Sequence, residues 1–460
     1  MCYTYRPSML LEGGSSYVRK AETHLIGQIS PKEPPSMIIP TIVEYFKKNC
    51  DTRGIPAIPN AEWMQFIQQH TKDDIRDSLA EYIVANNIPF PLKEISEHEF
   101  RNLFHTFSTR SMLPEYKDFP EVLERYDYRD KYSDMPLGVI DRSHAFNDIS
   151  DYFQQENRMR CGSSCTDAPM DTWQDQALLA KMNWIFWRTG VMRDSDMDQQ
   201  AFRAAFRLGT YTATQFKPTV AKALYEKHGA VNVLDTSCGW GDRLAGFYGT
   251  PSTQLYVGCD PNPAVFEVYK RQCMAYERLL GGSPILTEST DYFECVGKKT
   301  VKIWRRPSED VDWSLYADTF DFYFTSPPYF ETEKYASDTD KTSDQSWARY
   351  DTFTAWKQDF FFKVTQQVWS CIKTDGYMMI NIIEPRSRKG TRHNLCDDMV
   401  DTFSGFTDAH YLGKIGMRMA ARPDAAELKK VFIEPVWVWR KGNPVYPQPE
   451  PVASLDSFFT

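Results

Sequence analysis

An alternation of short apolar runs with helix-length segments constrains the second part of this 460-residue chain more than any other feature. The apolar runs of strand length lie at residues 231–235, 254–260, 284–290, 320–326 and 376–384. A long helix is expected over 353–373, and a late strand, interrupted at Pro435, is expected near 429–440. Strands that alternate with helices in this way form a mostly parallel sheet with helices on both faces. Ligands of such sheets bind at the carboxyl ends of the strands.

The first 200 residues have a mixed, mainly helical texture without internal repeats. Spaced apolar residues predict helices near 37–49 and 71–87, and the apolar stretch 174–192 predicts a core helix. Residues 118–151 and 161–171 read as loops, because the first is rich in Asp, Tyr, Arg and Pro and neither shows sustained periodicity. The residues of this part do not indicate its role.

These patterns predict three parts. They are a mainly helical region at 1–200 that could serve substrate recognition, an α/β domain at 201–442, and a Pro-rich extended arm at 443–460. The hydrophobic content of 42% argues against wholesale disorder, a collagen-like fibre and a coiled coil.

Charge and cysteine usage restrict the partners and the compartment. The net charge is −9, of which residues 1–200 carry −8, so any contact with nucleic acid must come from local basic segments. No apolar run approaches the ~18 residues of a membrane span, and the first 20 residues lack the order of a secretory signal. The ten scattered cysteines are typical of reduced thiols rather than a metal site. We therefore expect a cytoplasmic protein without metal or membrane association.

A glycine-containing turn follows the first strand, in the stretch VNVLDTSCGWGDRLAG. Asp235 ends the strand, and Ser237, Gly239 and Gly241 lie in the turn before a helix. Glycine lets the backbone turn sharply and approach a ligand, and a helix start offers free N–H groups. Asp260 ends the next strand, where a carboxylate can accept both hydroxyls of a ribose. The pair favours a nucleoside cofactor, and the absence of G-x-G-x-x-G and Walker patterns makes NAD and ATP less favoured.

The pentapeptide Thr325-Ser326-Pro327-Pro328-Tyr329 directly follows the strand FDFYF. Consecutive prolines fix the backbone and remove N–H donors, which leaves carbonyl oxygens as acceptors. A hydroxyl from Ser326 and a flat ring from Tyr329 add an acceptor and a stacking surface. The combination suits a planar base that carries an amino group, although Pro-Pro alone would indicate only a rigid turn.

At these residues the sequence resembles the S-adenosylmethionine-dependent amino methyltransferases of DNA, whose catalytic motif reads Ser-Pro-Pro-Tyr or Thr-Ser-Pro-Pro-Tyr. The resemblance covers roughly 210–440. It implies a Rossmann-like class I methyltransferase fold with a mostly parallel seven-stranded sheet. It also implies S-adenosylmethionine as cofactor, and Ser-Pro-Pro-Tyr is more typical of enzymes that act on the N4 group of cytosine than on the N6 group of adenine.

The resemblance assigns roles to individual residues. The catalytic set would be Ser326, Pro327, Pro328 and Tyr329. The cofactor set would be Phe216, Lys217, Asp235, Ser237, Gly239, Gly241, Asp260, Asp291 and Thr325. Within it, Asp235 to Gly241 and the upstream pair Phe216 and Lys217 would hold the methionine part, Asp260 the ribose, and Asp291 would lie near the adenine.

Two basic segments are candidates for phosphate contact. The segment 385–394 follows the strand at 376–384 and contains Arg386, Arg388, Lys389 and Arg392. The segment 298–307, with Trp304 among its basic residues, is either a phosphate contact or a solvated hairpin.

The favoured hypothesis is methylation of an exocyclic amino group in DNA, with cytosine N4 preferred. The alternatives are adenine N6, an RNA base, a glutamine side-chain amide, the transfer of a larger group to a base, and a nucleic-acid-binding module that has lost turnover. No cysteine lies in the Pro-Cys context that methylation of a cytosine ring carbon would require.

Overall fold

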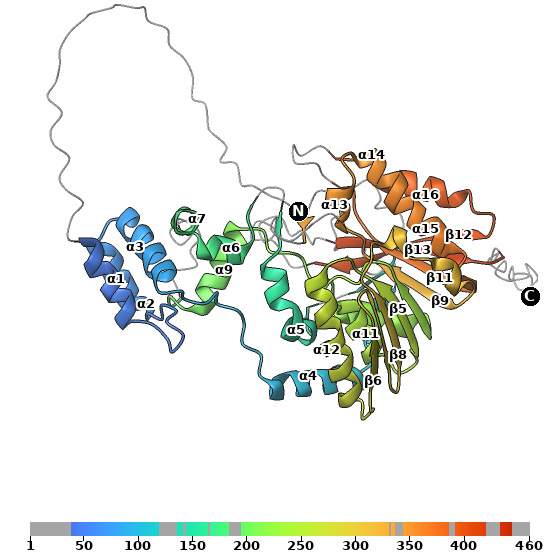
Figure 1. Ribbon diagram of the computed structural model, residues 1–460, viewed down its shortest axis with the longest axis horizontal. Helices are drawn as coiled ribbons and strands as arrows, with labels where there is room; N and C mark the ends of the chain where they lie inside the picture. Colours follow the sequence, from blue (N-terminus) through green and yellow to red (C-terminus); the bar gives the residue numbers. More distant parts are fainter. Residues whose placement is uncertain are drawn as a thin grey trace, which may run out of the picture. The chain divides into compact units, whose positions relative to one another are not determined.

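The structure is a computed structural model (Figure 1). It describes residues 38–118, 136–140, 144–163, 166–183, 195–330, 333–335, 344–385, 392–419 and 433–443. Contacts divide the chain into two compact units. The first comprises Met1–Lys93 and Met159–Thr212, and the second comprises Glu94–Arg158 and Ala213–Thr460. The predicted arm at 443–460 lies outside the described residues except for Asn443.

The described part of the first unit consists mainly of helices. These are α1 (Ile38–Lys48), α2 (Asn60–Gln69), α3 (Lys72–Ala85), α6 (Pro169–Gln174), α7 (Gln176–Met182) and α9 (Gln199–Gly209). The helices expected near 37–49 and 71–87 are confirmed as α1 and α3. The single helix expected over 174–192 is interrupted at Asp175, whose side chain accepts from the N–H groups of Ala177 and Leu178 at 2.9 Å and so starts α7. Residues 184–194 lie outside the described residues.

The second unit carries a sheet with eleven strands among the described residues. They are β1 (Tyr116–Asp118), β2 (Pro136–Ile140), β4 (Asn232–Asp235), β5 (Leu255–Cys259), β6 (Ile285–Glu288), β7 (Tyr292–Val296), β8 (Thr300–Trp304), β9 (Phe320–Thr325), β11 (Ile372–Asn381), β12 (Ala409–Arg418) and β13 (Ile433–Lys441). Their order is β1-β2-β12-β13-β11-β9-β4-β5-β8-β7-β6. The expected count of seven is therefore wrong.

The direction of the strands also differs from the expectation of a mostly parallel sheet. Parallel pairing runs through β8-β5-β4-β9-β11 and joins β12 to β2, whereas β13, β7, β6 and β1 pair with their neighbours antiparallel. Within the parallel part, the first strand in the chain lies at the centre, with the second and third on one side and the next two on the other. This is the order of a doubly wound, Rossmann-like sheet, and it reverses between β4 and β9.

The third parallel strand is not where the sequence placed it. The stretch 284–290 forms β6, an edge strand that pairs antiparallel with β7 and leaves Ile285 69% exposed. The third parallel strand is β8, which lies in the basic segment 298–307. Its Val301 and Ile303 are fully buried and alternate with partly exposed neighbours, so the strand is half-buried, and Lys302 is the basic residue of the segment that lies within it.

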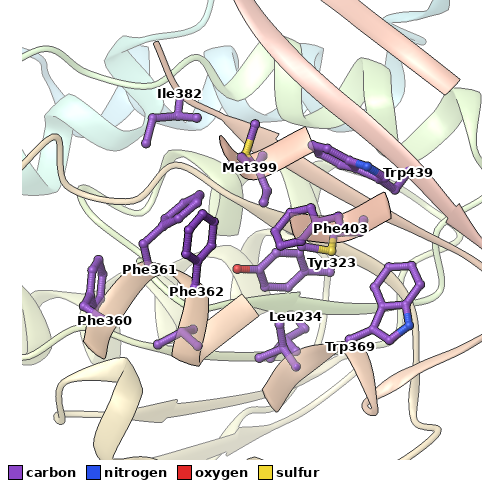
Figure 2. Close-up of a cluster of buried hydrophobic side chains, with 14 of the residues drawn as sticks. Leu234, Tyr323, Phe360, Phe361, Phe362, Trp369, Ile382, Met399, Phe403 and Trp439 are labelled. Atoms are coloured by element: carbon purple, nitrogen blue, oxygen red, sulfur yellow. The ribbon is translucent and has the colours of Figure 1, made fainter. Parts of the chain in front are cut away.

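Helices cover both faces of the parallel strands. On one face, Tyr225 of α10 (Pro218–Lys227) packs edge-on against Phe322 and Phe324 of β9. On the other face, Tyr323 and Leu234 join a cluster with residues of the π-helical segment η6 (Trp356–Phe362), α15 (Lys363–Trp369) and α16 (Cys396–Ser404) (Figure 2). Successive residues of β9 thus point to opposite faces, which explains its continuous run of apolar residues.

Residues 94–158 belong to the sheet-bearing unit, which moves the division away from the predicted boundary at 200. The strand β2 pairs with β12, and helix α4 (Glu97–Thr109) contacts α11 (Asp242–Gly249) and α12 (Pro263–Leu279). The loop expected at 118–151 is therefore wrong in part, because it contains β2 and the start of α5 (Asp148–Met159). The five-residue strand PLGVI is too short to show periodicity by itself.

Two further expectations are corrected near the end of the chain. The helix expected over 353–373 ends at Trp369, and its first half is η6 preceded by the short α14 (Phe353–Ala355). The strand β13 runs through Pro435 without interruption, opposite Gly416 of β12. None of the described helices has the length and apolarity that a membrane span requires.

Candidate functional site

Asp235 ends β4 and is fully buried. Its carboxylate forms an ion pair with Arg243 of α11, whose Nε lies 2.7 Å from Oδ2. Tyr256 of β5 donates its hydroxyl to Oδ2 at 2.6 Å, and Thr325 of β9 donates its hydroxyl to Oδ1 at 3.0 Å. The backbone N–H of Ser237 also donates to Oδ1, at 3.1 Å. Asp235 therefore ties three neighbouring strands and the following turn together from within.

The turn after β4 contains two glycines in the left-handed region. Gly239 has φ +57°, and a Cβ there would meet only the carbonyl of Ser237, at 3.8 Å. Gly241 has φ +73°, and a Cβ there would lie 2.6 Å from the side-chain oxygen of Gln272. Gly241 is thus required for packing as well as for conformation, whereas Gly239 leaves open space beside the backbone.

Asp260 follows β5 and is only partly buried. Its Oδ2 accepts from the N–H of Gly239 at 3.0 Å and from the hydroxyl of Tyr269 at 3.4 Å, and its Oδ1 accepts from the N–H of Asn262 at 3.0 Å. Burial raises the pKa of Asp260 to about 6, against these backbone hydrogen bonds. A carboxylate has about four acceptor positions, so Asp260 can accept at least one more donor.

The segment Thr325–Tyr329 turns away from the end of β9, next to the ends of β4 and β11. Thr325 is buried, and Ser326, Pro328 and Tyr329 are partly exposed. Ser326 donates its hydroxyl to Oδ1 of Asn381, the last residue of β11, at 3.1 Å. The structure thus brings this segment to the edge of the sheet where Asp235 and the glycine turn lie.

The residue after this segment, Phe330, has φ +51° and is buried. A bulky side chain rarely adopts this conformation, which costs on the order of 1–3 kcal/mol. Its ring packs edge-on against Phe353 and near Trp356, so the packing of the aromatic cluster holds the strained backbone in place. Strain of this kind concentrates at functional sites.

Phe216 and Lys217 lie just before α10 and reach the same edge. The ring centroids of Phe216 and Phe324 are 5.4 Å apart. The guanidinium carbon of Arg243 lies 5.1 Å from the ring centroid of Phe216. Lys217 is buried and donates to the carbonyl of Gln215 at 2.8 Å. Burial lowers the pKa of Lys217, and the nearby carboxylate of Asp242 opposes that shift.

Asp291 lies in the turn between β6 and β7. Its carboxylate forms an ion pair with Arg306 at 2.5 Å, and its carbonyl accepts from the N–H of Arg305 at 2.7 Å. The carbonyl of Trp304, the residue before Arg305, accepts from the N–H of Asp260 at 3.0 Å. Asp291 is therefore near the end of β5.

Of the four basic residues expected to contact phosphate, Arg386, Arg388 and Lys389 lie outside the described residues. Arg392 is described and exposed. The neighbouring ring of His393 stacks on Phe353 at 4.1 Å. Among the residues that the structure describes, no three His, Cys, Asp or Glu side chains gather as metal ligands.

No family model and no curated protein matches the chain. Solved structures give weak likenesses. Trm1 from Pyrococcus horikoshii, in complex with S-adenosyl-L-methionine, is 14% identical, with a TM-score of 0.31 over 50% of this chain and 57% of that one. The N-methyltransferase NodS from Bradyrhizobium japonicum, in complex with S-adenosyl-L-homocysteine, is 11% identical, with a TM-score of 0.29 over 49% of this chain and 86% of that one. TrmN from Thermus thermophilus is 10% identical, with a TM-score of 0.30 over 54% of both chains. These TM-scores are too low for a shared function to follow from the likeness.

The structure adds a buried polar network that sequence reasoning missed. Asp242, the first residue of α11, accepts from the hydroxyl of Ser150 and from the amide of Gln215, the latter at 3.0 Å. Burial raises the pKa of Asp242 to about 7, against the hydrogen bond from Ser150. Ser150 lies 92 positions earlier in the chain, so no local pattern could have joined the two.

Two other polar residues at this edge were missed. Tyr269 of α12 donates to the carbonyl of Gly239 and lies beside Asp260. Asn381 ends an apolar strand, and a polar residue at that point of the sequence was a usable signal. Both side chains meet residues that the sequence had singled out, and both are fixed in place by hydrogen bonds.

Proposed function

We propose that this protein transfers a methyl group from S-adenosylmethionine to an exocyclic amino group of a DNA base, with the N4 group of cytosine as the favoured target. The observation that carries the proposal is the 3.0 Å hydrogen bond from Thr325 to Asp235. It joins the Thr-Ser-Pro-Pro-Tyr segment to the strand before the glycine turn, across the point where the strand order reverses. Ligands of doubly wound sheets bind outside the strand ends at this point.

The residues at the ends of β4 and β5 fit the cofactor. The open space at Gly239 gives a ligand room to approach the backbone, and Asp260 keeps an acceptor position that suits a ribose hydroxyl. Phe216 and Lys217 would meet the methionine end, Ser237 would contribute polar groups from the turn, and Asp291 would lie toward the base. Asp235 would act indirectly, by holding Arg243, Thr325 and the turn in position.

The residues at the end of β9 fit an amino group. Ser326 and the carbonyl of Pro327 would accept its two N–H groups, and Tyr329 would stack on the ring that carries it. Accepting both hydrogens draws the nitrogen toward a tetrahedral shape and frees a lone pair that is otherwise delocalised into the ring. Positioning and electrostatic effects of this kind supply most of the acceleration when no covalent intermediate is needed.

When bound, S-adenosylmethionine supplies a methyl group on a positively charged sulfur. The amino nitrogen would take that group while the electron pair of the broken bond stays on sulfur, and it would release one proton to the solvent. A base inside a duplex would have to be flipped out first, at a cost of a few kcal/mol.

Basic side chains would hold the nucleic acid. We assign phosphate contacts to the segment with Arg386, Arg388, Lys389 and Arg392, since it follows the end of β11. The region at 1–200 would contribute target recognition. Its net charge of −8 argues against extended contact with the DNA backbone, so such recognition would use local groups.

The test is incubation with methyl-labelled S-adenosylmethionine and separate DNA and RNA pools, followed by mass spectrometry of the nucleosides. The expected product is N4-methylcytosine in DNA. Ser326→Ala should lower incorporation by about 10²–10³-fold with cofactor affinity nearly unchanged. Ser404→Ala, at an exposed serine of α16, is the matched control and should retain full activity.

Three results would overturn the proposal. They are the absence of labelled product from both pools, label on a ring carbon, and undiminished labelling by the Ser326→Ala variant. Label in RNA or on adenine N6 would keep the chemistry and change the substrate.

A further inference from the structure

The hydroxyl hydrogen of Ser326 is already committed within the protein. The side-chain amide of Asn381 lies between Ser326 Oγ, 3.1 Å from one terminal atom, and the carbonyl oxygen of Pro435, 3.0 Å from the other. Asn381 is 2% exposed, so water has little access to either contact. A three-member chain therefore links β9, β11 and β13 at the edge where the site lies.

The chemistry of the groups decides which way the amide faces. The carbonyl of Pro435 can only accept a hydrogen bond, so the NH₂ end of Asn381 must face it. The oxygen of Asn381 therefore faces Ser326. Because an amide oxygen can only accept, Ser326 must be the donor in that bond.

The backbone around Asn381 holds this arrangement rigidly. Asn381 pairs with Val436 across the antiparallel ladder of β11 and β13, and its neighbour Ile380 pairs with Thr325 across the parallel ladder of β11 and β9. Pro435 itself pairs with Gly416 of β12. The two ends of the amide are thus fixed by strands on either side of it.

We propose that Asn381 is a positioning residue that makes Ser326 an obligate hydrogen-bond acceptor toward the substrate. With its hydrogen directed at Asn381, Ser326 presents only lone pairs to a ligand. Pro327 and Pro328 add carbonyl oxygens and no N–H group. This corner therefore selects a group that donates, such as an exocyclic NH₂, over one that accepts, such as the exocyclic oxygen of uracil or thymine. The inference rests on the proposed function and deepens it by giving the polarity of the substrate.

The kinetic test compares Asn381→Leu, Ser326→Ala and the double variant. Asn381→Leu should lower kcat by about 10–100-fold while KM for the cofactor stays near the wild-type value. In the Ser326→Ala background the same change should have no further effect, because Asn381 acts only through Ser326. Asn381→Asp keeps an acceptor toward Ser326 and should retain a higher kcat than Asn381→Leu. Asn443→Leu, at an exposed asparagine that follows β13, is the control and should leave kcat unchanged.

Neutron diffraction from deuterated crystals of the wild-type protein gives a readout that needs neither turnover nor a variant. The deuterium on Ser326 Oγ should point at Asn381 Oδ1, and the two amide deuterons of Asn381 should lie on the side of Pro435. A deuterium that points away from Asn381 would overturn the inference, as would effects of the two substitutions that simply add.

The two proposals can fail separately. If no amino group is methylated, the proposed function fails, and the neutron map still decides whether Ser326 is held as an acceptor. If N4-methylcytosine forms but Asn381→Leu is fully active, the proposed function stands and the role of Asn381 is rejected.

Discussion

Asp235 and Asp260 end neighbouring parallel strands, and their carboxylates lie in very different surroundings. Asp235 is fully buried and bound by Arg243, Tyr256 and Thr325. Asp260 is partly exposed, and two of its three hydrogen bonds come from backbone N–H groups. Asp235 thus holds neighbouring strands together, whereas Asp260, at the equivalent end of the next strand, can still accept a hydrogen bond from a ligand. The difference arises from the partners, above all from the guanidinium that faces only Asp235.

The largest expected effect separates the two carboxylates by stability. Asp235→Asn should lower the free energy of unfolding by about 3–5 kcal/mol, since it leaves Arg243 buried without an opposing charge. Asp260→Asn, the same chemical change one strand away, should alter it by no more than about 1 kcal/mol. Urea unfolding of the two variants measures both values. Equal losses would remove the distinction.

A double variant tests whether replacing Asp235 lowers the free energy of unfolding because it leaves the charge of Arg243 without a partner. Asp235→Leu combined with Arg243→Leu should be more stable than either single variant, with a coupling of at least about 2 kcal/mol. The reason is that apolar groups can replace a buried ion pair, whereas a single remaining charge cannot be accommodated. Simple additivity of the two losses in urea unfolding would contradict this.

Cofactor affinity should respond in the opposite order to stability. Asp260→Asn should weaken binding of S-adenosylmethionine by about tenfold or more, because hydrogen bonds to a charged group contribute about 1.5–3 kcal/mol. Isothermal titration calorimetry measures the change. Asp312→Asn, at an exposed carboxylate that caps a short helix, is the matched control and should bind as the wild type does. Unchanged affinity in Asp260→Asn would place the ribose elsewhere.

The pH dependence of binding should carry the signature of Asp260. Its pKa of about 6 means that the carboxylate becomes protonated below that pH and loses acceptor capacity. Affinity for S-adenosylmethionine should therefore fall as the pH drops through about 6, by up to tenfold per pH unit. In Asp260→Asn this step should be absent. The free energy of unfolding should change in the opposite direction. Because the pKa of Asp260 is raised in the folded state, this carboxyl stabilises the protein less as the pH rises from about 4 to 6.

The smallest expected effect concerns the hydrogen bond that joins the Thr-Ser-Pro-Pro-Tyr segment to Asp235. Thr325→Val removes one hydrogen bond to Asp235 and keeps the shape of the side chain, so it should cost about 1 kcal/mol of unfolding free energy. Methyl transfer should fall by a larger factor than this stability loss suggests, because the Thr-Ser-Pro-Pro-Tyr segment would lose a fixed point. Thr319→Val, whose exposed hydroxyl bonds only to a nearby carbonyl, is the control for both measurements. Full activity in Thr325→Val would show that the link is not needed for positioning.

Much of the parallel sheet was predictable from the sequence. The strands expected at 231–235, 254–260, 320–326 and 376–384 are confirmed as β4, β5, β9 and β11. Each is a short apolar run bounded by turn residues, and burial on both faces produces that pattern wherever it occurs. The strand β8 was missed because its buried residues alternate with partly exposed ones, and the basic side chains within and around it suggested a surface segment.

The candidate site was predictable only as a set of positions. Glycines at 239 and 241, carboxylates at 235 and 260 and the segment at 325–329 all stand at strand ends in the sequence, and the doubly wound order brings them to one edge. Which of these side chains remain available to a ligand depends on residues distant in the chain. Thr325 is 90 positions from Asp235, and Ser326 is 55 from Asn381.

The local pattern of apolar and turn residues determined where β4, β5, β9, β11 and the glycine turn form, because those elements depend on neighbours in the chain. The direction of each hydrogen bond at the strand ends was decided by tertiary structure alone. A hydroxyl or an amide can face either way until strands from separate parts of the chain pair beside it, and only then does the partner's fixed chemistry, as at Pro435 and Arg243, leave one orientation possible.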